Sequence, residues 1–265
     1  MDFRRPVDAV CLSSGMDRGA FLDVINSEGR LFLEAAEGAG LGAAVPTCPG
    51  WTVADLVHHV GVVHRKAATY VGEGRPTPLI GDDLEAVVGP RPPDEALLDY
   101  FRDGFVALVD VFERAPADLE CWTFFAAPTP LDFWTRRQAH ELAVHRADAQ
   151  CASGIPGGYD GAFAADGVDE LLSGFFGDPH RARGFEVSGS MQITASDVDG
   201  RWHLEIEPGR LVTTRDERIS DVTVTGPASD LYLFLWNRAS ADTVEFGGDV
   251  RLLDAWRTTA RIRSR

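Results

Sequence analysis

The spacing of apolar residues divides the chain into a first half of helices and a second half of strands. Up to about residue 152, apolar side chains recur every three or four residues, which is the period of a helix with one buried face. This period predicts four helices, at residues 17–38, 52–71, 94–114 and 129–152. The segment between the second and third helices, 72–93, is rich in Gly, Pro and Asp and is predicted to be a loop. Four helices with one long connection are typical of a helical bundle.

The second half changes to the period of strands. A helix is predicted at 162–176, and apolar and polar residues then alternate in FEVSGSMQITASD, RWHLEIE, RLVTTR and DVTVTG. Two helices, at 228–237 and 249–262, close the chain. The sequence therefore predicts a multidomain protein of the α and α+β classes. A four-helix bundle is expected at 16–153 and an α+β domain with a largely antiparallel sheet at 160–265, joined by the glycine-rich segment CASGIPGGYDG.

The ends of these segments carry further signals. Thr52 stands where a helix N-cap is expected, and Asp55 follows three residues later in the place of a capping-box acid. Residues 1–15 precede the first helix-like segment and lack the continuous apolar stretch of a signal peptide. We therefore expect residues 1–15 to be a disordered extension and the protein to be cytoplasmic.

Composition narrows the classes of function. The chain has 25 basic and 41 acidic residues, for a net charge of -16. A field of this sign repels phosphate backbones and anionic membranes, and no stretch is apolar enough to span a bilayer, so neither nucleic acid nor membrane is an expected partner. The four widely spaced cysteines predict neither a disulfide framework nor a thiolate zinc site. Abundant Arg, Ala and Gly beside a single lysine are typical of GC-rich genomes such as those of actinobacteria. A monomer is the default expectation.

Histidines and acids cluster on two of the predicted helices. In the fourth, within QAHELAVHRADA, Glu141 and His145 are four residues apart and share one helical face. In the second, within LVHHVGVVH, lie His58, His59 and His64. Side chains from facing helices of a bundle can bind a metal, and imidazole with carboxylate is an ordinary zinc ligand set. Periodicity alone leaves open which histidine of the second helix takes part, or whether these are ordinary core and surface residues.

These same segments carry a family resemblance. VPTCPGWTVADLVHHVGVVHR, RQAHELAVHRADAQ and, more loosely, GGDVRLLDAW resemble the mycothiol-dependent maleylpyruvate isomerase family. The resemblance covers the chain from Met16 onward. It implies a DinB-like metal-binding bundle followed by a domain similar to sterol carrier proteins. It also implies a metal, expected to be Zn²⁺, held by His59, Glu141 and His145.

The resemblance further implies an enzyme that uses mycothiol with an electrophilic small molecule as its substrate. In such an isomerase the thiol adds to the conjugated double bond of maleylpyruvate, the resulting single bond rotates, and elimination follows. A mycothiol S-transferase is the related possibility. Dicarboxylate substrates need cationic partners, for which the candidates are Arg65, Arg146 and Arg238; each could instead be an ion-pair residue of the fold. The assignment of catalytic residues stays open.

Two further polar residues extend the stripe of Glu141 and His145. Gln138 and Asp148 are candidates for orienting a ligand, or are ordinary polar helix positions. Two other classes of function fit the same residues. The chain could be a non-catalytic metal-binding regulatory or small-molecule-binding protein, or a metal-dependent hydrolase that generates hydroxide at its open coordination position.

Overall fold

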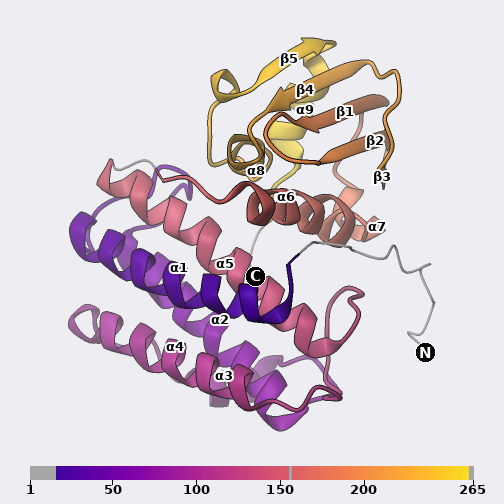
Figure 1. The fold of residues 1–265 in the computed structure, drawn as a ribbon. Coiled ribbons are helices and arrows are strands. Elements are labelled where there is room, and N and C mark those ends of the chain that lie inside the picture. The colour runs from indigo at the N-terminus through magenta and orange to yellow at the C-terminus, as the bar shows by residue number, and fades with distance from the viewer. Residues whose placement is uncertain (1–15, 155–156, 263–265) are drawn as a thin grey trace. The chain divides into compact units, whose positions relative to one another are not determined.

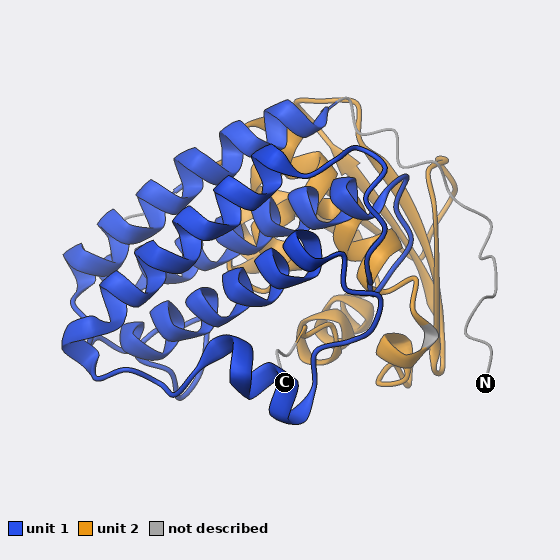
Figure 2. Ribbon diagram, turned by 90° about the horizontal axis from the view of Figure 1, so that it is seen from below, with its two compact units in different colours: residues 1–157 blue, residues 158–265 orange. Residues whose placement is uncertain are grey.

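The chain divides into two compact units (Figure 2). The computed structural model describes residues 16–154 and 157–262. Unit 1 ends at Gly157, and unit 2 begins at Gly158. The extension expected at residues 1–15 lies outside the described residues. Among the described residues, no helix has both the length and the apolar character needed to cross a membrane.

Unit 1 is a helical bundle whose long helices lie at the positions that the periodicity predicts. α1 packs mainly against α5, and α2 packs against both α4 and α5 (Figure 1). These helices are α1 (Arg18–Ala39), α2 (Val53–Glu73), α4 (Leu97–Arg114) and α5 (Pro130–Ser153). Large apolar side chains such as Ile25, Phe32, Leu56 and Leu108 are fully buried between them. The prediction of a helical first half is thus confirmed.

The helices that carry the histidine and acid cluster have well-defined starts. Thr52 and Asp55 form the predicted capping box of α2: the Thr52 hydroxyl accepts a hydrogen bond from the Asp55 N–H, and the Asp55 carboxylate accepts one from the Thr52 N–H at 2.9 Å. At α5, Thr129 caps the helix and Pro130 occupies the first turn. Each cap fixes the residue at which its helix begins.

The prediction of a loop at 72–93 is wrong for the middle of this segment. It contains the short helix α3 (Gly81–Val88), and α4 is preceded by a 3₁₀ turn (Asp94–Ala96). Acidic residues occupy the first turn of α3, where they complement the helix dipole, and none of its residues is fully buried. Gly81 and Gly89 at its two ends give the segment the composition of a loop, which conceals the short helix between them.

Unit 2 is an α+β fold around a five-stranded sheet with the order β3-β2-β1-β4-β5. β1 and β4 pair in parallel and the other neighbours pair antiparallel, so the prediction of a largely antiparallel sheet is confirmed. The strands are β1 (Gly189–Ala195), β2 (Arg201–Glu207), β3 (Arg210–Thr214), β4 (Val222–Gly226) and β5 (Glu245–Gly248). The periodicity missed β5, which is short, ends in two glycines and is exposed throughout.

Helices complete unit 2 before, between and after the strands (Figure 1). The predicted helix at 162–176 is α6 (Gly161–Asp169), which continues into a π-helical turn (Glu170–Phe175). The short α7 (Pro179–Ala182) precedes the sheet, while α8 (Ala228–Leu235) and α9 (Val250–Thr259) match the two predicted closing helices. The core includes alternate residues of β2, namely Trp202, Leu204 and Ile206. Trp256 of α9 is also fully buried, and its indole N–H donates to the Leu235 carbonyl at 3.1 Å.

Candidate metal centre

Antiparallel packing of α2 and α5 brings the predicted ligands together. His59 of α2 contacts Glu141 of α5, and further along α2 Tyr70 stacks on Trp134, which lies earlier in α5, with ring centroids 4.8 Å apart. The two helices therefore run in opposite directions past one another. Because Glu141 and His145 share one face of α5, the same crossing places both beside His59.

Three potential ligand atoms converge at this crossing. The Nε2 atoms of His59 and His145 each lie 3.2 Å from Oε1 of Glu141, and all three atoms lie within 4.8 Å of one another. The side chains are largely shielded from solvent: the exposed fraction is 14% for His59, 9% for His145 and 16% for Glu141. Two imidazoles and a carboxylate are an accepted ligand set for a divalent transition metal, so the donor set fits a metal. His58 and His140, the neighbours in sequence, are not part of this cluster.

Asp148 fixes the orientation of the His145 ring. Its carboxylate is fully buried, and Oδ2 lies 2.8 Å from Nδ1 of His145. The same carboxylate accepts hydrogen bonds from the Thr47 hydroxyl at 2.5 Å and from the Cys48 thiol at 3.4 Å, both in the loop before α2. A carboxylate that accepts from Nδ1–H leaves Nε2 facing the cluster, which is the arrangement expected of a residue that orients a metal ligand.

Gln138 does not make a contact like the one that Asp148 makes with His145. Its side chain is fully buried on α5, and within the described part of the chain neither the amide nitrogen nor the amide oxygen has a hydrogen-bond partner. The helical spacing correctly places Gln138 on the inner side of α5. The spacing carries no information on whether the amide reaches an imidazole or the carboxylate, and the structure shows no such bond.

The cluster holds a strongly coupled pair of charges. Burial acts to raise the pKa of Glu141, but the charge and hydrogen bond of His145, followed by the hydrogen bond of His59, hold it well below its usual range. Burial likewise acts to lower the pKa of His145, but the Glu141 charge and the Asp148 hydrogen bond outweigh it and raise the pKa to about 9. Without a metal, a proton therefore lies between the ligand atoms of Glu141 and His145 at neutral pH.

The arginines proposed as partners for a substrate are engaged within the protein. The Arg65 guanidinium stacks on the Tyr100 ring, 3.5 Å from its centroid. Buried Arg146 forms an ion pair with Glu28. In unit 2, the Arg238 guanidinium donates to a backbone carbonyl two residues earlier at 2.8 Å. These contacts favour the alternative that each of the three is a structural residue.

Sequence reasoning missed the arginine that touches the cluster. Arg137 of α5 donates to Oε2 of Glu141 at 3.1 Å, and its side chain is 3% exposed. The signal was present, because an arginine four residues before a glutamate on one helix lies on the same face.

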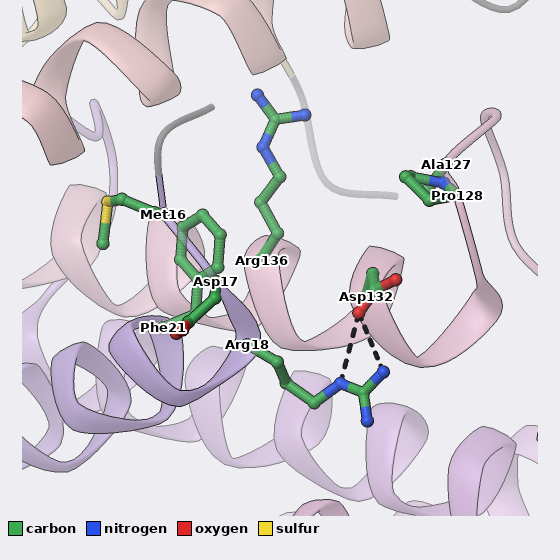
Figure 3. Close-up of a pocket in the computed structure, with 8 residues that line it drawn as sticks. All are labelled: Met16, Asp17, Arg18, Phe21, Ala127, Pro128, Asp132 and Arg136. Carbon is green, nitrogen blue, oxygen red and sulfur yellow. Dashed lines mark hydrogen bonds and ion pairs between the residues drawn. The ribbon is translucent and has the colours of Figure 1, made fainter. Parts of the chain in front are cut away.

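A separate cavity opens near the start of α1. Its volume is about 380 Å³, and Figure 3 shows Arg18 bound to Asp132 at one wall and Arg136 extended along another. None of the three cluster residues lines it. The lining consists of Met16, Asp17, Arg18, Phe21, Ala127, Pro128, Asp132 and Arg136.

The fold and the cluster together define a class of protein: a helical bundle with a possible metal-binding triad, followed by an α+β unit. Residues 22–150 match the mycothiol maleylpyruvate isomerase N-terminal domain, and residues 162–255 match the MDMPI C-terminal domain. The chain belongs to the mycothiol maleylpyruvate isomerase family, which is a family of enzymes. The predicted family and the prediction of an enzyme are confirmed at this level.

Solved structures show the same fold over both units. The crystal structure of the mycothiol-dependent maleylpyruvate isomerase is similar with a TM-score of 0.62 at 14% identity, covering 91% of this chain and 97% of that one. The structure of a histidine-to-alanine mutant of that isomerase is similar with a TM-score of 0.62 at 13% identity and the same coverage. No curated protein matches the chain in sequence.

Proposed function

We propose that this chain is a metal-dependent enzyme that uses mycothiol as its thiol cofactor or cosubstrate. Its reaction is a cis-trans isomerisation of the maleylpyruvate type or the transfer of the thiol to an electrophile. The observation that carries the proposal is the convergence of His59, Glu141 and His145 in a chain of this family. Zinc is the proposed metal, since two imidazoles and a carboxylate are ligands that zinc accepts.

The chain's own residues have distinct roles in this proposal. His59, Glu141 and His145 hold the metal, and Asp148 keeps the His145 ring turned so that Nε2 faces it. A divalent metal bound there supplies Lewis acidity and favours the ionised form of a coordinating thiol. The low exposure of the three side chains limits the access of water to the reacting groups. No cysteine is assigned as a nucleophile, because the reactive thiol comes with the cosubstrate.

Metal content and thiol dependence together test the proposal. We expect the purified protein to hold about one metal per chain and to convert maleylpyruvate, or a panel of electrophiles, only when mycothiol is present. His59→Ala should lose both properties. His58→Ala is the matched control, because His58 is the adjacent histidine and stacks on Tyr100, outside the cluster, with ring centroids 5.6 Å apart.

Three other outcomes would contradict the proposal. Metal without any turnover, together with a co-purified protein partner, would favour a regulatory binding protein. Hydrolysis of esters or amides without a thiol would favour a metal-dependent hydrolase. Full activity of His59→Ala would remove the cluster from the reaction.

A further inference from the structure

The two carboxylate oxygens of Glu141 have different partners. Oε1 faces the two imidazoles and lies 3.2 Å from each Nε2 atom. Oε2 accepts a hydrogen bond from the Arg137 guanidinium at 3.1 Å. Arg137 lies one helical turn before Glu141, and only 3% of its side chain is exposed. The carboxylate is therefore held in one rotation, with a single oxygen presented to the cluster.

This hydrogen bond is difficult to break. A guanidinium that donates to a carboxylate makes a charge-assisted bond, which is stronger than a bond between neutral groups. Both partners are shielded from water, so a rotation of Glu141 that removed Oε2 from Arg137 would leave a buried guanidinium without this counter-ion. A glutamate without such a partner can offer both oxygens to one cation and occupy two coordination positions instead of one.

Arg137 also changes the charge around the cluster. Asp148 and Glu141 contribute two carboxylates, and neutral imidazoles contribute no charge. The Arg137 guanidinium places a positive charge directly beside Glu141. A positive charge next to the proposed ligands favours an anionic ligand such as a thiolate.

We infer that Arg137 is a positioning residue that limits Glu141 to a single-oxygen contact and thereby keeps a coordination position for an external thiolate. This inference rests on the proposed function, because it assumes a metal at the cluster. It adds to the three proposed ligands a residue, Arg137, that does not itself bind the metal but favours an anionic sulfur ligand.

Cobalt substitution tests this role without any measurement of turnover. Wild type, Arg137→Met and Arg137→Lys are loaded with Co²⁺, whose visible spectrum reports the coordination number, and are titrated with 2-mercaptoethanol. A thiolate bound to Co²⁺ gives a sulfur-to-metal charge-transfer band. We expect wild type to show this band, and Arg137→Met to keep about one Co²⁺ per chain but to bind the thiol at least about tenfold more weakly. The d–d bands of this variant should change toward those of Co²⁺ with a higher coordination number.

Two controls separate the effects of charge, geometry and general destabilisation. Arg137→Lys keeps the positive charge but not the planar donor, and should have an intermediate thiol affinity. Arg136→Met removes the neighbouring buried arginine, which lines the cavity in Figure 3, and should match wild type. If Arg137→Met does not fold, Arg137→Lys carries the test.

The outcomes distinguish this inference from the proposed function. A wild-type protein that binds no Co²⁺ or shows no charge-transfer band overturns both. A wild-type protein that does both, with the same thiol affinity and the same spectrum in a folded Arg137 variant, overturns the role of Arg137 alone. The same loss in Arg136→Met also overturns it, because the effect would then not be specific to the partner of Glu141.

Discussion

Two histidines buried in the same bundle, His145 and His64, have opposite electrostatic properties. His145 lies between the carboxylates of Glu141 and Asp148, which raise its pKa to about 9 despite burial. His64 is fully buried against aromatic rings of α4, and within the described residues neither of its ring nitrogens has a hydrogen-bond partner. Burial lowers the pKa of His64 to about 3, and the more distant Glu141 charge does not compensate.

The difference indicates what a buried histidine needs in order to act as a metal ligand. Burial alone produces a neutral imidazole that packs as an aromatic residue, as at His64. A carboxylate on one ring nitrogen orients the ring and directs the other nitrogen, as Asp148 does for His145. The following predictions test this contrast, from the largest expected effect to the smallest.

Replacement of His145 should abolish metal binding, whereas replacement of His64 should leave it unchanged. His145→Ala removes a ligand, so we expect metal content to fall from about one per chain to near zero in elemental analysis. His64→Leu replaces a neutral ring by an apolar side chain of similar size and should keep the metal. Equal loss of metal in both variants would show that His64 supports the cluster and that the contrast is wrong.

Acid should destabilise the protein through His64. Its folded-state pKa of about 3 lies below the unfolded value of 6.5, so between these pH values the unfolded chain binds a proton that the folded chain excludes. The free energy of unfolding should fall as pH decreases through this window, by about 4 to 5 kcal/mol in total from this residue. Urea unfolding at a series of pH values measures this slope.

His64→Leu is the control for the acid effect. It should unfold within about 1.5 kcal/mol of wild type at pH 7 and show a shallower slope below pH 6.5. An unchanged slope would assign the acid sensitivity to other groups.

The orientation of His145 should contribute a moderate part of the metal affinity. Asp148→Asn keeps the shape of the side chain but weakens the bond to Nδ1, so we expect the metal dissociation constant to rise about 10- to 100-fold. Competition with a chromophoric chelator measures this change. Thr47→Val removes only one of the hydrogen bonds that hold Asp148 and should have a smaller effect. A Thr47→Val effect as large as that of Asp148→Asn would contradict a direct role for the carboxylate.

Metal binding should release a proton from His145. In the metal-free protein the raised pKa of about 9 keeps this ring protonated at pH 7.5, and a metal can bind Nε2 only after the proton leaves. We expect the release of about one proton from this residue at pH 7.5, decreasing as pH rises through 9. Calorimetry in two buffers of different ionisation enthalpy measures it. Zero release at pH 7.5 would show that Glu141 and Asp148 do not hold the proton.

Sequence periodicity was sufficient for much of the fold, because long amphipathic helices and alternating strands repeat their signal many times. It failed for α3 and β5, which are short and bounded by glycines. It also could not reveal the parallel pairing of β1 with β4, because alternation fixes the faces of a strand but not its neighbours.

The candidate site, like the fold, could be predicted from the sequence only in part. The spacing of Glu141 and His145 placed both on one face, but periodicity did not choose between His58 and His59. That choice depends on the angle at which α2 crosses α5, which is a tertiary property. Arg137 shows a related limit, because the sequence placed it on the right face without showing that it reaches Oε2 of Glu141.

The distance in sequence between the ligands has a consequence for the topology of unit 1. His59 and Glu141 are 82 residues apart, so a metal shared by them joins α2 to α5 and closes a loop that contains α3 and α4. Such a metal binds the folded protein and leaves when its ligands separate, so it stabilises the folded state by mass action rather than by restricting the unfolded chain. A chelator would therefore lower the free energy of unfolding of unit 1 as well as remove the metal from the site.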